Sequence, residues 1–493
     1  IMKIEISDFK KIPNSPLESS LFIGGKDIET KSFITRYSPA HLKPVSKISE
    51  GTKENVDYAT SIAKKTFENS SWSKMTSKDR SYLFIKLSEL IKKNYETIGY
   101  LDSIESGKPY LQAKDEVLGS VDHWHWVGGV LRTISGETYN HLGENKLGLT
   151  LREPIGVVGI ITPWNFPFLI ASEELPYALA SGNTAIIKPS EFTSSSTIFL
   201  SKLMKEAGFP DGVVNVVTGY GNTVGTAIVD NKDIRMISFT GSTKVGKIIV
   251  EGSAKNLKKT KLELGGKNPM VVFGDSNLNE AADAAAKATF FNSGECCVSG
   301  SRILVEKKIS EEFVQKVLEK TKKIIVGDPL DEKTTIGPMI NESQYEKVQN
   351  YINIGKKEST LRCGGTANNN LFIDPTVFDN VNNGAKIATD EIFGPVMSVI
   401  PFNNYDDAIK ISNDTDYGLS AGVFTNDFSK ALNFSKQVKA GSVWINTFLE
   451  PRPEMPFGGY KSSGLGRKFG IEEYTEKKAV TFHIGKRTDW WLK

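Results

Sequence analysis

Ile155-Gly-Val-Val-Gly-Ile-Ile161 is a short run of apolar, mostly β-branched residues, and it opens a regular alternation in the sequence. Similar runs follow at residues 184–188, 213–217 and 236–239, and segments with helical spacing of their apolar residues separate them. Such alternation is typical of βαβ units, whose parallel sheet is covered by helices on both faces. We therefore expect an α/β fold with a parallel sheet at its centre.

A second alternating region begins at Pro269-Met-Val-Val-Phe273 and runs to about residue 446. It contains a helical pattern over residues 280–290, so we expect a second α/β domain. The N-terminal part is different, because apolar residues three and four apart predict helices over residues 53–65 and 79–93. A chain of 493 residues is long enough for two or three domains.

The composition excludes several classes of partner. The 61 basic and 58 acidic residues nearly cancel, so no overall field would attract nucleic acid or an anionic membrane. The longest apolar stretch is too short to span a bilayer, and residues 2–8 lack the apolar run of a signal peptide. Three cysteines cannot form a disulfide framework, which favours a reducing compartment, by default the cytoplasm. Small molecules and copies of the same chain are the expected partners.

The segment Ser238-Phe-Thr-Gly-Ser-Thr-Lys-Val-Gly-Lys-Ile248 is similar to a phosphate-binding P-loop up to its last position. There Ile248 stands where a P-loop needs a hydroxyl group to hold magnesium. What remains is a strand, a Gly241-Ser242 turn and a helix N-terminus, whose amides and dipole suit an anion without a metal. A dinucleotide pyrophosphate meets that description, although a plain strand-to-helix connection would leave the same pattern.

Lys188 and Glu191 directly follow a predicted strand. Ligands of open sheets bind at the carboxyl ends of parallel strands, where this pair could clamp a ribose diol. A carboxylate at that place would repel a 2′-phosphate, which favours NAD over NADP. The alternative is that Ser190-Glu191 only begins the next helix.

Two further segments carry candidate catalytic groups. In Thr162-Pro-Trp-Asn-Phe-Pro-Phe168 the prolines would hold the Asn165 amide in one direction, as an oxyanion donor requires, or the segment is only a packed aromatic turn. In Leu262-Glu-Leu-Gly-Gly-Lys-Asn-Pro269 a carboxylate precedes a Gly-Gly turn between the two domains. Clefts between domains are favoured ligand sites, so Glu263 is either a general base or a surface residue beside a flexible turn.

Two of the three cysteines stand together in Phe290-Phe-Asn-Ser-Gly-Glu-Cys-Cys-Val-Ser-Gly300. Free amides at a glycine-opened turn can stabilise a thiolate, as a nucleophile requires, whereas most cysteines are buried and inert. Neighbouring side chains on a helix diverge by roughly 100°, so only one of Cys296 and Cys297 can face a substrate well. The five histidines form no pattern with zinc-ligand spacing, so no metal site is expected.

In this order the motifs resemble those of the aldehyde dehydrogenase family, and the resemblance covers nearly the whole chain. The family's cysteine signature is matched by Phe290, Gly294 and Glu295. This match implies that Cys297 is the nucleophile and that Cys296 is not.

The resemblance also implies the other parts of the site. The Glu-Leu-Gly-Gly-Lys motif implies Glu263 as the base, and the Pro-Trp-Asn-Phe motif implies Asn165 as the oxyanion-hole amide. The implied cofactor is NAD, with NADP second. The residues that would bind it are Trp164, Lys188, Glu191, Gly225, Gly241, Ser242, Thr243, Leu264, Glu391 and Phe393.

The implied reaction is the NAD-dependent oxidation of an aldehyde to a carboxylate. Cys297 would form a thiohemiacetal and then a thioester, which water activated by Glu263 would hydrolyse. One alternative is acylation of coenzyme A, against which the presence of Glu263 argues. Another is a cysteine thioester or ester hydrolase without redox chemistry.

The family's architecture implies two Rossmann-like domains and a small β flap. The NAD-binding domain would comprise residues 1–130 and 151–264, and the catalytic domain residues 265–462. The oligomerisation flap would comprise residues 131–150 and 463–493, and the strand character of its C-terminal part could add to a neighbour's sheet. A homodimer or homotetramer is expected.

One departure from the family concerns the aldehyde. Many relatives carry a Trp-Lys pair after the Asn165 loop, where this chain has Ala171-Ser-Glu-Glu-Leu-Pro176. The change would place Glu173 and Glu174 beside the family's aldehyde tunnel. A later tunnel loop adds Phe448 and the carboxylates of Glu450 and Glu454. Arg452 in the same loop could neutralise one of these two carboxylates. Aromatic and carboxylate groups suit a cation, so the sequence favours a substrate such as betaine aldehyde or an aminoaldehyde.

Overall fold

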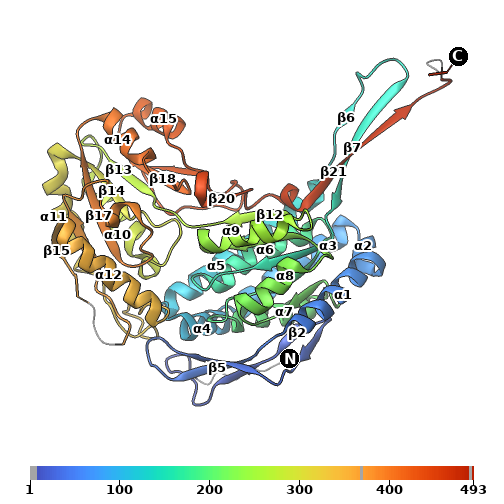
Figure 1. Ribbon diagram of the computed structural model, residues 1–493, viewed down its shortest axis with the longest axis horizontal. Helices are drawn as coiled ribbons and strands as arrows, with labels where there is room; N and C mark the ends of the chain where they lie inside the picture. Colours follow the sequence, from blue (N-terminus) through green and yellow to red (C-terminus); the bar gives the residue numbers. More distant parts are fainter. Residues whose placement is uncertain (1–7, 367–369, 488–490, 493) are drawn as a thin grey trace.

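A computed structural model describes residues 8–366, 370–487 and 491–492 of the chain. The stretch that argued against a signal peptide lies outside the described residues, apart from Asp8. Two large sheets with their helices form the body of the molecule, and a narrow β arm projects from it (Figure 1). None of the helices in the part of the chain that the structure describes has the length and apolar character that crossing a bilayer requires.

The first sheet has eight strands in the order β20-β12-β11-β8-β9-β10-β2-β3. Its five central strands run parallel: β8 (Val157–Ile161), β9 (Thr184–Lys188), β10 (Val214–Val216), β11 (Ile234–Thr240) and β12 (Lys259–Glu263). Antiparallel strands stand at the edges: β2 (Leu21–Ile23), β3 (Lys26–Ile28) and β20 (Gly464–Leu465). From β8 the chain builds outward in one direction through β9 and β10, and then in the other through β11 and β12. Ligands of such sheets bind outside the carboxyl ends of the strands at this reversal.

Helices cover both faces of the first sheet because its strands are apolar on both sides. Val158, Ile160 and Ile187 pack on one side, while Val157 and Ile186 pack on the other. The first group of helices comprises α3 (Ser77–Lys93), α4 (Tyr95–Ser106), α5 (Tyr110–Val130), α6 (Pro167–Ala180) and α7 (Ser195–Ala207). The second group comprises α1 (Lys53–Asn69), α8 (Thr226–Asp230) and α9 (Thr243–Ala254).

The second sheet has seven strands in the order β15-β16-β17-β14-β13-β18-β19. All pairs are parallel except β15 with β16. The strands are β13 (Pro269–Val272), β14 (Arg302–Glu306), β15 (Thr360–Cys363), β16 (Thr376–Asp379), β17 (Val396–Phe402), β18 (Ser420–Phe424) and β19 (Ser442–Ile445). One face carries α10 (Leu278–Phe290) and α11 (Ser310–Thr321), and the other carries α12 (Glu342–Glu358), α13 (Lys386–Thr389), α14 (Tyr405–Asn413) and α15 (Phe428–Gln437).

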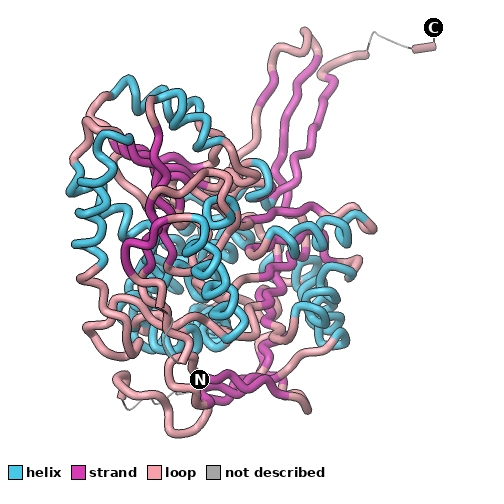
Figure 2. Tube along the Cα trace, turned by 60° about the vertical axis from the view of Figure 1, so that its left-hand side comes forward, coloured by secondary structure: helices cyan, strands magenta, loops and turns pink. Residues whose placement is uncertain are grey.

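Two small sheets complete the fold. The projecting arm consists of β6 (Thr138–Tyr139), β7 (Lys146–Pro154) and β21 (Thr475–His483), in the order β21-β7-β6 (Figures 1 and 2). Near the N-terminus, β1 (Leu17–Ser19), β5 (Pro44–Ser49) and β4 (Phe33–Tyr37) form the other. β21 is an edge strand of the arm, so its outer backbone groups face away from the sheet.

The structure confirms the predicted α/β class, with two Rossmann-like parts and a small β arm. The predicted strands at residues 184–188 and 236–239 are β9 and β11, and the predicted helices became α1 and α3 with a few more residues each. The proposed domain boundaries stay a prediction. The strand β7 runs across the boundary predicted at residue 150. The strand β20 lies within the predicted flap but pairs with β12 of the first sheet.

Candidate active site

The three predicted catalytic residues meet in one cavity of about 230 Å³. It lies where the loops after β8, β11 and β12 of the first sheet face the second sheet, at the reversal of strand order. Asn165, Glu263 and Cys297 all line it. The other lining residues are Pro163, Trp164, Thr240, Gly241, Ser242, Leu264, Gly265, Gln344, Lys347, Glu391 and Phe393.

A sharp turn after α10 delivers the cysteine pair. Asn292, Ser293 and Gly294 all have left-handed backbone conformations, with φ of 53°, 57° and 73°. At Gly294 a Cβ atom would stand 2.1 Å from a backbone oxygen of Gly394, so no larger residue fits there. Cys296 then packs into the apolar core, 5% exposed, and Cys297 lines the cavity. Of the two neighbouring cysteines, Cys297 is the one that lines the cavity.

The backbone of Cys297 is fixed from the first strand of the second sheet. The Asn268 amide nitrogen, just before β13, donates to the carbonyl oxygens of Cys297 and Ser299, both at 2.9 Å. Its amide oxygen accepts from the backbone N–H of Ser420 at 2.9 Å. Because all of these contacts are buried or partly buried, they fix the backbone that carries the Cys297 thiol.

Electrostatics act on the thiol in opposite directions. A hydrogen bond with the Cys296 thiol lowers the pKa of Cys297, burial raises it, and the positive charge of Lys468 lowers it. The net effect lowers the pKa, which favours the thiolate.

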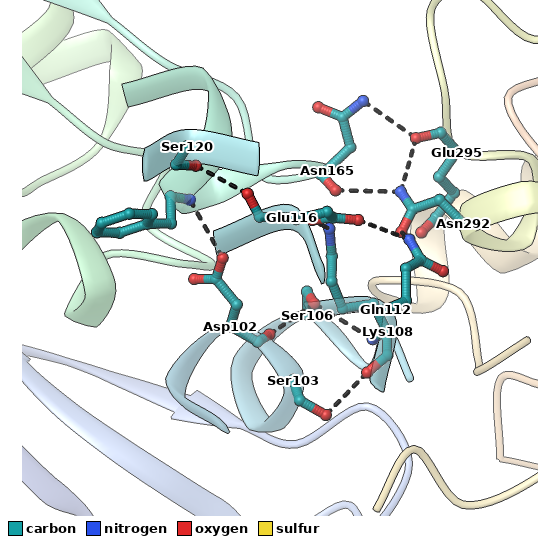
Figure 3. A network of polar contacts seen from close by, with 11 residues as sticks. Asp102, Ser103, Ser106, Lys108, Gln112, Glu116, Ser120, Asn165, Asn292 and Glu295 are labelled. Atoms are coloured by element: carbon teal, nitrogen blue, oxygen red, sulfur yellow. Dashed lines mark hydrogen bonds and ion pairs between the residues drawn. The ribbon is translucent and has the colours of Figure 1, made fainter. Parts of the chain in front are cut away.

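Asn165 is 4% exposed and stands just before α6. Its Nδ2 donates to the carbonyl oxygen of Glu295 at 3.0 Å, and its backbone oxygen accepts from Asn292 Nδ2 at 3.0 Å (Figure 3). The start of α6 is held by the Asp102 carboxylate, which accepts from the backbone N–H of Phe168 at 3.2 Å. The loop is therefore a packed turn, and this packing is also what holds the Asn165 amide in one direction. The two interpretations of the segment do not exclude each other.

Glu263 ends β12 and is 3% exposed, so it is not the surface residue of the alternative interpretation. In the described part of the chain neither of its carboxylate oxygens has a hydrogen-bond partner. Burial, opposed by the charges of Lys468 and Lys261, raises its pKa to about 8. A carboxyl group with a pKa near the working pH is suited to accept and release a proton.

A buried cluster of charges lies behind Glu263. Lys468 Nζ lies 3.0 Å from Glu173 and 3.6 Å from Glu174, and Lys261 Nζ lies 2.5 Å from Glu174. Burial would raise the pKa of Glu174, but the charges of Lys261 and Lys468 outweigh it and hold the value at about 2. Sequence reasoning missed Lys468, because nothing in its neighbourhood distinguishes it from any other basic residue.

The carboxylates expected beside the aldehyde tunnel are mostly neutralised. Glu174 lies on α6, is 1% exposed and is bound by Lys261, so its charge is neutralised within the fold. Arg452 lies 3.0 Å from Glu450, as the sequence suggested it could. Phe448 is 2% exposed and packs on Trp444 in the core of the second sheet. Glu454 is exposed.

Six of the predicted cofactor residues line the cavity: Trp164, Gly241, Ser242, Leu264, Glu391 and Phe393. Ser242 is the N-cap of α9, and its hydroxyl accepts from Val245 N–H at 3.3 Å. The rings of Trp164 and Phe393 meet edge to face at 5.5 Å. Gln344 and Lys347, three residues apart on α12, also line the cavity, and the sequence analysis did not single them out.

The remaining predicted cofactor residues lie outside this cavity. Thr243 lines an adjoining cleft of about 780 Å³ that also contains Ser242 and Lys347. Lys188 Nζ lies 3.5 Å from the Glu191 carboxylate, and a Cβ atom added to Gly225 would stand 3.9 Å from the Lys188 side chain. The ten residues thus form a cavity, an adjoining cleft and a separate Lys188 group, which an elongated anionic ligand could connect. The helix N-terminus at Ser242 suits the anionic middle of such a ligand.

Comparison with known proteins points in one direction. The sequence pattern described as "Aldehyde dehydrogenase family" matches residues 26–480. Retinaldehyde dehydrogenase 3 of Mus musculus is 42% identical over 481 residues, which cover 95% of this chain and 94% of that protein. An NAD-dependent aldehyde dehydrogenase from Sinorhizobium meliloti has a similar structure, with a TM-score of 0.95, 41% identity and 96% of both chains covered. An NAD+ complex of an aldehyde dehydrogenase from Bacillus cereus gives a TM-score of 0.93 and 38% identity, covering 95% of this chain and 97% of that one.

Proposed function

The chain belongs to the aldehyde dehydrogenase family, and from this premise we propose that it oxidises an aldehyde to a carboxylate with NAD as the oxidant. The observation that carries the proposal is the meeting of Cys297, Asn165 and Glu263 in one cavity. A thiol with a lowered pKa, an amide donor and a carboxyl group with a raised pKa are the groups that this reaction needs.

The first step is attack by the Cys297 thiolate on the aldehyde carbon. A carbon–sulfur bond forms, and the electrons of the carbonyl double bond move to its oxygen. The second N–H of the Asn165 amide, which is not needed for the Glu295 contact, can donate to that oxyanion. The thiolate is available because the net effect on the Cys297 pKa is a lowering.

The cavity and its neighbouring groups fit NAD. The Ser242 helix start suits the pyrophosphate, the Lys188–Glu191 pair suits a ribose diol, and Glu391 with Phe393 would hold the nicotinamide end. Glu391 is itself held, because it accepts from the backbone N–H of Gly266 at 3.0 Å. When bound, NAD supplies the two-electron acceptor that converts the thiohemiacetal carbon to the oxidation level of a thioester.

Glu263 completes the reaction by removing a proton from a water molecule that attacks the thioester carbon. The carbon–sulfur bond breaks, the carboxylate leaves and the Cys297 thiolate is restored. A raised pKa makes the Glu263 carboxylate a stronger base toward water than an ordinary carboxylate. Hydrolysis by water is favoured over acylation of coenzyme A because a buried carboxylate lines the cavity beside the nucleophile.

For the aldehyde we propose a cationic compound, such as betaine aldehyde or an aminoaldehyde. Glu454 supports this choice, because it is exposed and its charge acts on His123 of α5 and Tyr177 of α6. Glu173, Glu174 and Glu450 add little to it, since each contacts a cation.

We also propose a homo-oligomer in the cytoplasm. β21 is an edge strand of the projecting arm, and edge strands readily pair with another chain. The three free cysteines favour a reducing compartment.

The experiment follows NADH formation with betaine aldehyde, an aminoaldehyde, a plain aliphatic aldehyde and succinic semialdehyde, and identifies the product. The expected result is NADH together with free carboxylic acid, with cationic aldehydes ahead by at least about tenfold in kcat/KM, or roughly 1.4 kcal/mol. A requirement for coenzyme A would show acylation instead, and ester cleavage with no NADH from any aldehyde would show a hydrolase. Preference for succinic semialdehyde would overturn the cationic substrate alone.

A further inference from the structure

A buried asparagine that the reaction does not use connects the amide donor to the nucleophile loop. Asn292 is 3% exposed, and its Nδ2 donates to the carbonyl oxygens of Asn165 and Glu295, both at 3.0 Å. Asn165 Nδ2 donates to that same Glu295 oxygen at 3.0 Å (Figure 3). The three residues therefore close a small ring of hydrogen bonds one residue before the cysteine pair.

A second amide orients the first. Gln112 on α5 donates from Nε2 to Asn292 Oδ1 at 2.9 Å and to Glu116 Oε1 at 2.7 Å. Glu116 is in turn paired with Lys108 (Figure 3). A flipped Gln112 would place its oxygen against two acceptors, and a flipped Asn292 would do the same against two carbonyl groups. Each amide therefore has one favourable orientation, which is set by its neighbour in the chain of contacts.

The backbone at Asn292 shows why the residue type matters. Its φ of 53° is left-handed, a conformation that glycine and asparagine adopt at low cost. Glycine would satisfy the turn but not the contacts, because it has no side-chain amide. The turn and the ring of hydrogen bonds together select asparagine.

We propose that Asn292, oriented by Gln112, is a positioning residue that fixes the Asn165 amide toward the oxyanion. This inference rests on the proposed function, because it gives the Asn165 amide its role there. The ring holds one N–H of that amide on Glu295, which leaves the other directed by the planar geometry of the group. Preorganised donors of this kind stabilise the transition state without a cost of reorientation during the reaction.

A double-mutant cycle tests the proposal. Asn292→Gly keeps the left-handed turn and removes only the amide. We expect it to lower kcat/KM for an aliphatic aldehyde by roughly tenfold to a hundredfold. This loss should not exceed the loss caused by removing the oxyanion donor itself in Asn165→Ala. In an Asn165→Ala background the same change should cost less than about twofold, because the group through which Asn292 acts is already gone.

The matched control is Asn380→Gly. Asn380 is an exposed asparagine with a φ of 54°, so the substitution makes the same backbone change away from the cavity and should leave kcat/KM unchanged. The proposal is overturned if Asn292→Gly matches the wild type, or if it costs the same factor with and without Asn165. If Asn292→Gly does not fold, Gln112→Met removes the hydrogen bond that orients the Asn292 amide. This variant should show the same coupling to Asn165 with a smaller loss of kcat/KM.

Two further measurements separate this role from others. Alkylation of Cys297 by iodoacetamide should change less than about twofold in Asn292→Gly, since the backbone of Cys297 is held separately by Asn268. A loss of alkylation as large as the loss of kcat/KM would place the effect on the thiol and overturn the proposal. Cleavage of p-nitrophenyl acetate also forms an oxyanion but needs no NAD, so the same cycle can be run on it. Failure of aldehyde oxidation in the wild type would then refute the proposed function, while the ester cycle still decides the role of Asn292.

Discussion

Two groups of residues at the cavity differ in the kind of contact that holds them. The first group, which we call the amide wall, consists of Asn165, which lines the cavity, with Asn292 and the Glu295 backbone in contact with it. All of the contacts among these residues are neutral hydrogen bonds of 3.0 Å. The other group, which we call the charged wall, consists of Glu263 with Lys468, Glu173 and Glu174 behind it. There Glu263 has no hydrogen-bond partner in the described part of the chain, and ion pairs hold the rest.

The difference matches two kinds of chemical work. A donor to an oxyanion must keep one direction, and fully paired amides provide a fixed direction at any pH. A proton acceptor must change its charge during each turnover, so it cannot be tied to strong partners. We therefore expect substitutions in the amide wall to change rates uniformly with pH, and substitutions in the charged wall to change the pH profile itself.

The largest loss of activity should follow substitution of Cys297, the nucleophile on which the residues of both walls act. Cys297→Ala removes the thiol that lines the cavity, and should lower kcat for aldehyde oxidation by roughly 10⁴-fold or more. Cys296→Ala is the matched control, because its sulfur packs in the core and only supplies a hydrogen bond that lowers the pKa of Cys297. We expect it to keep more than about a tenth of the wild-type kcat. If Cys296→Ala is the inactive variant, the assignment of the nucleophile is wrong.

Removing the base should give the next largest effect. Glu263→Gln should lower steady-state kcat by about 10²- to 10⁴-fold but leave a rapid burst of about one NADH per site, because only thioester hydrolysis needs the carboxylate. In the wild type the hydrolysis rate should rise with pH and level off above about 8, as the carboxyl group with its raised pKa ionises. Rapid-mixing measurements check both points, and a variant without a burst would place Glu263 in an earlier step.

The same substitution should change stability in a direction fixed by linkage. Burial raises the pKa of Glu263 from 4.5 to about 8, so its proton stabilises the folded state below pH 4.5, and this contribution is lost as the pH rises to about 8. Glutamine has no charge to bury, so Glu263→Gln should melt above the wild type near pH 9 and close to it near pH 5. An equal difference at both pH values would contradict the raised pKa.

A substitution in the amide wall should behave differently. Asn165→Ala should lower kcat/KM by roughly 10²- to 10³-fold, because one oxyanion donor is lost. The factor should be the same at every pH, and the pH profile should keep its wild-type shape, since no charge is removed. A profile that moves with Asn165→Ala would show that the two walls are coupled and would break the comparison.

The sequence was informative wherever the signal was local. β-branched runs such as residues 184–188 predicted strands correctly because a strand buried on both faces needs apolar residues in succession. Asn165, Glu263 and Cys297 could be predicted as candidates because each lies in a short motif of prolines or glycines that fixes a turn. Asn165 and Glu263 meet because the topology brings the loops after β8 and β12 to one edge of the first sheet, and Cys297 reaches the same cavity from the turn after α10.

The rest depends on contacts between distant segments. Lys468 meets Glu173 across 295 positions of the chain, and Gln112 meets Asn292 across 180. Neither pair has a spacing that a sequence pattern could reveal. The ion pair of Glu174 could not be predicted for the same reason, because Lys261 on β12 reaches it from a segment that had no visible relation to α6.

The smallest of the expected effects is also the most direct test of the charged wall. Lys468 lowers the pKa of both Glu263 and Cys297, so Lys468→Met should raise both values. At pH 7 less carboxylate and less thiolate would then be present, and kcat/KM should fall by about tenfold, the effect of roughly one pH unit, and recover as the pH rises. The control is Lys53→Met, which removes an exposed lysine with its own carboxylate partner and should change neither rate nor profile.

Exchanging the two charges decides whether the pair or the single cation matters. Lys468→Glu alone would place a fourth carboxylate beside Glu173, Glu174 and Glu263. Of the cations in the ion pairs described above, Lys261 alone would remain. The variant should therefore destabilise the fold by about 3–5 kcal/mol. Adding Glu173→Lys restores an opposite pair at the same place, so the double variant should melt well above the single one and recover part of its activity. If the double variant is no better than the single one, or if Lys468→Met leaves the pH profile unmoved, the charge of Lys468 does not set the proton affinity of this wall.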